Sequence, residues 1–189
     1  MKVVVAVDSF KGSMTSMEAG MAVKAGVLAA HKDAEVIVKP LADGGEGTTD
    51  ALIEGLNGER VDVTVTGPYH EPVNAYYGYL KDTNTAVMEM ASAAGITISE
   101  QKDPMIATTY GVGEMILHAI NKGIRNFIIG IGGSATNDGG IGMLKALGFT
   151  FLGKDGQDTG EGGQALERVS SIITVSYTHL RAHETGRNL

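Results

Sequence analysis

The chain has 189 residues, a formal net charge of −7 and a hydrophobic fraction of 43%, values typical of a globular protein with one or two small domains. Its acidic balance and 5% aromatic content argue against a nucleic-acid partner, whose phosphates attract basic surfaces. The absence of cysteine excludes disulfides and thiolate chemistry, and the first apolar run is too short for a signal peptide or a membrane span. We expect a cytoplasmic protein without membrane contact. The composition does not indicate its oligomeric state.

Short apolar runs and helical patterns alternate along the chain in the order typical of α/β proteins. Apolar or alternating runs predict strands at 2–7, 35–40, 60–66, 72–80, 85–90 and 127–130. Capping residues and helical periodicity predict helices at 15–31, 48–56, 91–94, 109–122 and 141–147. We therefore expect an α/β fold with mostly parallel sheets and flanking helices.

Three loops rich in Gly, Asp, Ser and Thr follow predicted strands, at residues 8–13, 42–48 and 131–140. Ligand sites of open parallel sheets gather at the carboxyl ends of strands, so the three loops predict one composite site. The third loop also precedes a helix, where free N–H groups and the helix dipole favour an anion such as phosphate. The predicted substrate or phosphate contacts are Ser9, Ser13, Gly44, Gly45, Thr109, Gly132, Gly133, Ser134, Thr136 and Asn137.

Three residues are candidates for the chemistry itself. Lys11 could neutralise a transferring phosphoryl group, or it could be an ordinary surface lysine. Asp8 could act as a base for a substrate hydroxyl, anchor Lys11, or simply form a turn. Asp138 could be a base or a metal ligand, or it could cap the helix that starts near Gly139.

Other acidic residues leave similar alternatives open. Asp43 and Glu46 flank two glycines and could coordinate Mg²⁺, together with Asp138. They could equally form an Asx turn and a favourable acidic group at a helix start. Glu89, at the end of a predicted strand, could be a functional residue or could cap a helix.

A dinucleotide-binding pattern is also present, as Gly130-x-Gly132-x-x-Ala135. The helix does not begin at once, however, because residues 136–140 extend the loop. No acidic residue stands at a strand end about 20 residues on, where a ribose contact is expected. An oxidoreductase is therefore disfavoured.

Four blocks together resemble the bacterial glycerate kinase family, in the family's order and over residues 1–175. They are Asp8–Ser13, Ala42–Thr48, Thr108–Gly111 and Gly130–Gly140. The resemblance implies ATP-dependent phosphorylation of D-glycerate to 2-phosphoglycerate, with Mg²⁺ accompanying the ATP. It also implies two α/β domains with the site in the cleft between them, the first flavodoxin-like or Rossmann-like.

The family's later blocks are absent, so the chain is expected to be a truncated, N-terminal part of such a protein. We expect an incomplete first domain at 1–66 and an incomplete second domain at 67–175. Residues 176–189 lack apolar periodicity and resemble a translated sequencing adapter, which predicts an artefactual tail. The alternative to a glycerate kinase is a non-catalytic phosphometabolite-binding module or an inactive fragment.

Overall fold

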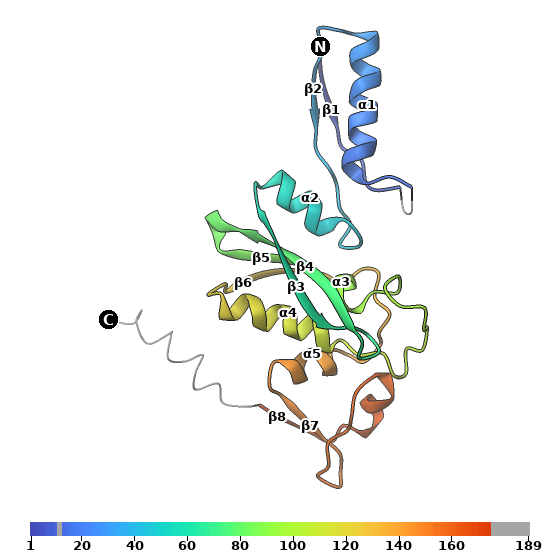
Figure 1. Cartoon of the computed structure of the whole chain (residues 1–189), viewed down its shortest axis with the longest axis vertical. Coiled ribbons are helices and arrows are strands. Elements are labelled where there is room, and N and C mark those ends of the chain that lie inside the picture. The colour runs from blue at the N-terminus through green and yellow to red at the C-terminus, as the bar shows by residue number, and fades with distance from the viewer. Residues whose placement is uncertain (11–12, 175–189) are drawn as a thin grey trace, which may run out of the picture.

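The computed structural model describes residues 1–10 and 13–174. The expectations for Lys11 and for the tail at 176–189 concern residues outside this part. The described chain forms an N-terminal β–α–β unit, a central sheet with helices on both faces, and a small C-terminal lobe (Figure 1). The N-terminal unit extends away from the rest of the molecule and joins it near helix α2 (Figure 1).

The N-terminal unit consists of β1 (Lys2–Val5), α1 (Ser16–Ala30) and β2 (Glu35–Val38). The two strands are parallel, and α1 connects them as a crossover helix. A capping box starts α1: the hydroxyl of Thr15 accepts from the Glu18 N–H, and the Glu18 carboxylate accepts from the Thr15 N–H. This start confirms the predicted capping pattern.

The central sheet contains β3 (Glu59–Thr66), β4 (Pro72–Leu80), β5 (Thr85–Glu89) and β6 (Asn126–Gly130), in that order. The α/β class is confirmed, but this sheet is mixed rather than mostly parallel. β3, β4 and β5 pair antiparallel, whereas β5 and β6 are parallel. Short connections, including the 3₁₀ turn η1 (Lys81–Thr83), allow only antiparallel pairing, and a parallel pair needs a long crossover.

The predicted domain boundary between residues 66 and 67 falls inside this sheet. β3 pairs with β4 along its whole length, from Glu59 opposite Tyr79 to Thr66 opposite Pro72. The change from one sheet to the next lies earlier, between β2 and β3. The turn at Gly67–Pro68 therefore connects the two strands of a hairpin.

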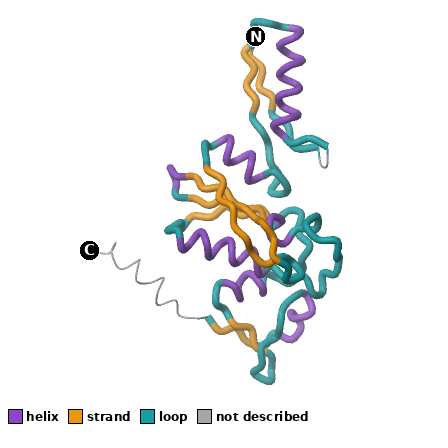
Figure 2. The backbone as a smooth tube through the Cα atoms, in the orientation of Figure 1, coloured by secondary structure: helices purple, strands orange, loops and turns teal. Residues whose placement is uncertain are grey.

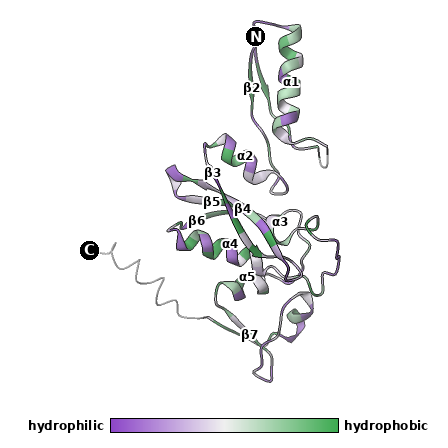
Figure 3. Ribbon diagram, viewed as in Figure 1, coloured by the Kyte–Doolittle hydropathy of each residue, from purple (hydrophilic) through white to green (hydrophobic). Residues whose placement is uncertain are grey.

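Helices cover both faces of the central sheet. On one face lies α4 (Tyr110–Asn121), whose ribbon carries both apolar and polar residues (Figure 3). The Tyr77 hydroxyl of β4 lies 3.2 Å from His118 Nδ1 of this helix. On the other, α2 (Thr48–Gly55) packs so closely that a Cβ on Gly78 would lie 2.6 Å from Ile53. Tyr77 and Gly78 are consecutive, so the alternation of strand side chains puts them on opposite faces. The main core, on the α4 face, includes Val65, Ala75, Tyr77, Ala86, Met88, Val112, Met115 and Ile116.

The remaining elements complete the carboxyl end of the sheet and the C-terminal lobe. They are α3 (Ala91–Ala94), α5 (Ile141–Ala146), β7 (Thr150–Leu152), the 3₁₀ helix η2 (Gly163–Arg168) and β8 (Ser171–Ile173). β7 and β8 form an antiparallel pair, and neither is among the strands predicted above. The loops after β5 and β6 lie together on one side of the sheet (Figure 2). Parallel strands therefore deliver their following loops to one place, as expected.

Candidate functional site

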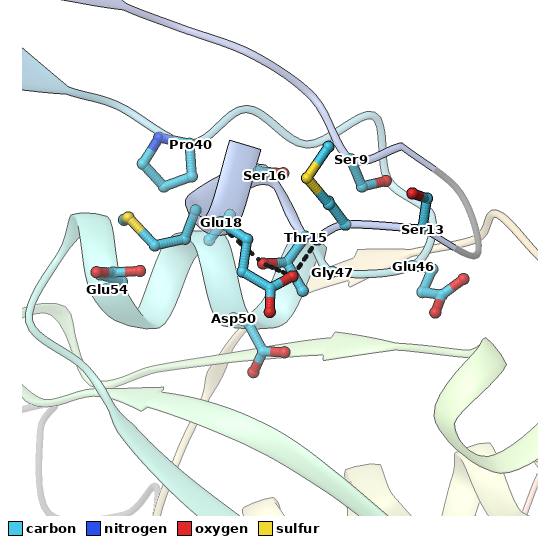
Figure 4. A pocket seen from close by; sticks show the side chains of 13 residues that line it. Ser9, Ser13, Thr15, Ser16, Glu18, Pro40, Glu46, Gly47, Asp50 and Glu54 are labelled. Carbon is cyan, nitrogen blue, oxygen red and sulfur yellow. Dashed lines mark hydrogen bonds between the residues drawn. The ribbon is translucent and has the colours of Figure 1, made fainter. Parts of the chain in front are cut away.

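The first two predicted loops face each other across a pocket of about 460 Å³ (Figure 4). Ser9 and Ser13 line it from the first loop, and Glu46 and Gly47 line it from the second. The start of α1 and the exposed side of α2 close the remaining walls. The pocket therefore lies where the N-terminal unit joins the rest of the described chain.

Carboxylates dominate the charge of this pocket. Glu18, Glu46, Asp50 and Glu54 contribute to its wall, and among the described residues no Lys or Arg does. The Glu18 carboxylate is engaged in the capping box, and its hydrogen bonds from Thr15 lower its pKa. A phosphate group entering such a pocket would be repelled unless a cation came with it or stood beside it.

The second and third loops meet through glycine backbone. The Gly132 N–H donates to the Gly44 carbonyl at 2.8 Å. A Cβ on Gly130 would lie 2.6 Å from the Gly44 carbonyl oxygen, and one on Gly132 would lie 2.7 Å from the Gly45 Cα. Only glycine permits so close an approach of two backbones. The predicted convergence of the three loops is thus confirmed, with the second loop in the middle.

The third loop is held by its own hydroxyls and by α3. Ser134 Oγ lies 2.8 Å from Thr136 Oγ1 and accepts from the Thr136 N–H. The Ala135 N–H donates to Ala94 O, and Gly133 O accepts from the Ile96 N–H. These bonds order the loop beside the second one and leave Gly133 exposed.

Asn137 and Thr109 lie away from the meeting point of the loops. The Asn137 side-chain oxygen lies against Gly163 of η2, where a Cβ would come within 2.1 Å of it. Thr109 is buried, and its hydroxyl donates to Asp138 and accepts from the Met143 N–H. Asn137 is therefore an exposed residue beside η2, whereas Thr109 connects the starts of α4 and α5.

Asp138 is buried, and its carboxylate caps two helix starts. Its carboxylate is 1% exposed and accepts from the N–H and hydroxyl of Thr109 and from the N–H groups of Gly140 and Gly142. Both oxygens are thus committed to the starts of α4 and α5. This geometry matches the capping alternative, because helix starts leave N–H groups that a buried carboxylate can satisfy.

The remaining predicted metal ligands sit on the second loop. Asp43 forms the expected Asx turn, since its Oδ1 accepts from the Gly45 N–H at 2.9 Å, while Glu46 is exposed and lines the pocket. Within residues 1–10 and 13–174, no three Asp, Glu, His or Cys side chains form a preformed metal cage. Mg²⁺ usually takes only one or two carboxylates and binds through substrate phosphates and water. The oxygen donors of this loop fit such a shared ion.

Asp8 is exposed at the end of the first strand, next to the pocket. Its Oδ1 accepts from the Ser9 N–H at 2.7 Å, which is a local turn contact. Among the residues that the structure describes, no hydrogen bond from another element engages this carboxylate. Asp8 is therefore the predicted base that the structure leaves accessible.

Glu89 is a buried acid that the predicted site residues did not include. It is 6% exposed, and its Oε1 accepts from the Thr49 N–H at 2.7 Å. Burial raises the pKa of Glu89 above the usual 4.5, although the hydrogen bond from Thr49 opposes this shift. In the sequence, the signal for this residue was its place at the end of a predicted strand.

The raised pKa of Glu89 predicts a pH-dependent effect of Glu89→Gln on stability. Because the pKa of Glu89 is higher in the folded protein than in the unfolded chain, the folded protein binds a proton at Glu89 more tightly. The stability that this protonation contributes is lost as pH rises through the folded-state pKa. We expect the free energy of unfolding of Glu89→Gln, relative to wild type, to increase from pH 4.5 towards neutral pH. Urea unfolding at several pH values would measure it. The exposed control Glu59→Gln should show no such trend, and a trend of opposite sign would contradict the prediction.

The fold and the glycine-lined junction define an α/β protein whose loops meet at the carboxyl ends of strands. A model of the glycerate kinase family matches residues 3–185. The chain therefore belongs to the glycerate kinase family, as its loop motifs indicated.

Named relatives agree with this assignment. The chain is 45% identical over 174 residues to the glycerate kinase of Bacillus subtilis (strain 168), covering 91% of this chain and 46% of the relative. It is 44% identical over 174 residues to the glycerate 2-kinase of Escherichia coli (strain K12), with the same coverage. The chain thus spans about half the length of the curated relatives it matches.

A solved structure shows the same fold. A crystal structure described as that of a glycerate kinase 2 from Salmonella typhimurium LT2 superposes with a TM-score of 0.80 at 46% sequence identity. The match covers 91% of this chain and 46% of the other. None of the helices in residues 1–10 and 13–174 is long and apolar enough to cross a lipid bilayer.

Proposed function

We propose that this chain forms part of the site of an ATP-dependent glycerate kinase. The reaction would transfer the γ-phosphoryl group of Mg-ATP to the 2-hydroxyl of D-glycerate and give 2-phosphoglycerate. A cytoplasmic setting fits a chain without cysteine. Relatives named for this activity and the family model support the proposal at the level of the family.

The contact between the second and third loops is the observation that carries the proposal. Backbone N–H groups of a glycine-rich loop can approach phosphate oxygens closely, because no Cβ intervenes. A hydrogen bond between the Gly132 N–H and the Gly44 carbonyl joins two such loops. They lie beside a pocket large enough for a small ligand. Phosphoryl transfer depends mainly on positioning and charge neutralisation, which such loops supply.

The accessible residues suggest how the work is divided. Asp8 would accept the proton of the attacking hydroxyl, since Asp138 is buried and fully hydrogen-bonded. Asp43 and Glu46 would hold a Mg²⁺ ion that arrives with the nucleotide and neutralises phosphate charge. Gly133 and Ser134 would contact the phosphates, and Gly132, whose N–H is donated to the Gly44 carbonyl, would hold the third loop beside the second. Lys11 remains a proposed cationic partner from the first loop.

Binding and turnover test this proposal separately. With Mg-ATP, we expect NMR shifts at the amides of Gly44, Gly45, Gly132 and Gly133, and none at the core residue Met115. ADP release should require both D-glycerate and Mg²⁺, and in a chain that turns over, Asp8→Asn should lower kcat by about 100-fold or more. Asp33→Asn, an exposed residue of the turn after α1, is the control. Unshifted loop amides would contradict the proposed site.

A second candidate is a non-catalytic phosphometabolite-binding module. It is favoured by the coverage, since the chain matches only 46% of the relatives' length. Shifts at the loop amides without ADP release would select the module. Release of ADP that depends on glycerate would select the kinase.

A further inference from the structure

Glu89 lies next to the residues that join the second and third loops to the rest of the structure, Thr49 and Gly130. It is the last residue of β5, and strand alternation puts it on the same face as Val87, opposite Ala86 and Met88 of the α4 core. That face is the one covered by α2. Glu89 is therefore a buried acid at the carboxyl end of a strand, directed to the start of α2.

The start of α2 has no cap of its own. Its N-cap residue, Gly47, has a positive φ of 87° and no side chain to accept the first free N–H groups. Glu89 fills this role from another element, because its Oε1 accepts from the Thr49 N–H at 2.7 Å. Thr49 is 1% exposed, so water cannot replace the carboxylate as acceptor. The Asp43–Gly47 loop leads directly into this capped turn.

The backbone around Glu89 is joined to the strand that leads into the third loop. Glu89 lies opposite Gly130 in the parallel register of β5 and β6, and the next residue, Met90, donates its N–H to the Gly130 carbonyl. Gly130 in turn lies against the Gly44 carbonyl oxygen. One residue thus connects the helix that follows the second loop with the strand that precedes the third.

We infer that Glu89 is a positioning residue that holds the loop of residues 43–47 against the loop of residues 130–133. Its importance for catalysis rests on the proposed function, but its effect on the loops does not. Asp50 and Tyr76 are the other ionisable groups near it, and the Tyr76 hydroxyl donates to Asp50. A buried carboxylate beside another acid is unfavourable for folding, and such groups cluster at functional sites.

Amide hydrogen exchange in the ligand-free chain tests the inference directly. In Glu89→Ala, protection of the Thr49 and Gly132 amides should fall by about tenfold or more, because one lost buried bond releases both loops. Met115 in α4 should keep its protection. Glu89→Gln keeps an acceptor oxygen and should restore both amides. Glu59→Ala removes an exposed glutamate at the far end of β3, bound to Lys81, and should leave all three amides unchanged.

Loss at Thr49 without loss at Gly132 would overturn the inference, since Glu89 would then only cap α2. Unchanged protection at both would also overturn it. If the alanine variant loses protection at Met115 as well, Glu89→Asp decides. Its shorter side chain withdraws the acceptor but keeps the charge, and losses confined to Thr49 and Gly132 would support the inference. Losses at neither amide in that variant would overturn it.

Mg-ATP binding separates this inference from the proposed function. In a chain that binds Mg-ATP, Glu89→Asp should weaken binding by about fivefold or more, and Glu59→Ala should not. A wild-type chain that does not bind Mg-ATP would contradict the proposed function while the exchange result stood. Normal exchange at the Thr49 and Gly132 amides in Glu89→Ala and Glu89→Asp would overturn the positioning role whatever the chain binds.

Discussion

Replacing Asp138 by alanine is expected to destabilise the protein by about 3 kcal/mol, because buried donors lose their acceptor. The substitution leaves the N–H and hydroxyl of Thr109 and the N–H groups of Gly140 and Gly142 without the carboxylate that now binds them. Asp138 is 1% exposed and Thr109 is 3% exposed, so water cannot replace the carboxylate at Thr109 in the folded protein. Urea unfolding followed by circular dichroism would measure the loss.

The matched control is Asp33→Ala, an exposed aspartate in the turn after α1, which should change stability by less than about 0.5 kcal/mol. Asp138→Asn should lie between the two, since it keeps one acceptor oxygen but turns an amide N–H₂ towards other donors. If Asp138→Ala instead kept its stability and lost Mg-ATP binding or turnover, Asp138 would be a functional ligand or base and not a cap.

A methyl group on Gly132 is expected to force the second and third loops apart. The Cβ of Gly132→Ala would lie 2.7 Å from the Gly45 Cα and 3.0 Å from both the Gly44 carbonyl oxygen and the Gly45 nitrogen. All three atoms are backbone, so no rotation of a side chain relieves the clash. We expect a loss of about 2 kcal/mol in urea unfolding, in the range typical of overpacking. Under the proposed function, Mg-ATP affinity should fall by about tenfold or more.

Gly26→Ala provides the control for this experiment. Gly26 lies in α1, and the Cβ of an alanine there would have no neighbouring atom within 4 Å. The substitution should stabilise the helix by about 0.5–1 kcal/mol, because alanine loses less conformational freedom on folding than glycine. A Gly132→Ala protein with wild-type stability and wild-type Mg-ATP affinity would mean that the two loops do not touch in solution.

Local chemistry made much of the fold predictable. The Thr15–Glu18 capping box and the alternation of residues 60–66 place α1 and β3 with little reference to the rest of the chain. The loop motifs identified the family, and the expected meeting of the loops followed from where parallel strands end. The central sheet differs from the expected mostly parallel arrangement, since β3, β4 and β5 pair antiparallel.

The site was less predictable because an acidic residue beside glycines has the same sequence signature whether it binds a ligand or caps a helix. Asp43 forms an Asx turn, and its neighbour Glu46 lines the pocket. Asp138 also stands beside glycines in the sequence, but it is almost completely buried. The burial of Asp138 depends on the packing of α4 against α5. The hydrogen bond between Thr109 and Asp138 at this contact joins residues that are 29 positions apart in the sequence.

The sequence by itself determined the α/β class, the order of most elements, the family and the three loops that meet. Each of these depends on interactions over a few residues or on a motif read in order. Only the tertiary structure decided that Asp138 is a cap, that Thr109 is committed to it, and that Glu89 connects two loops. Those roles depend on which side chains are removed from water and paired, and pairing over tens of residues leaves no periodic trace in the chain.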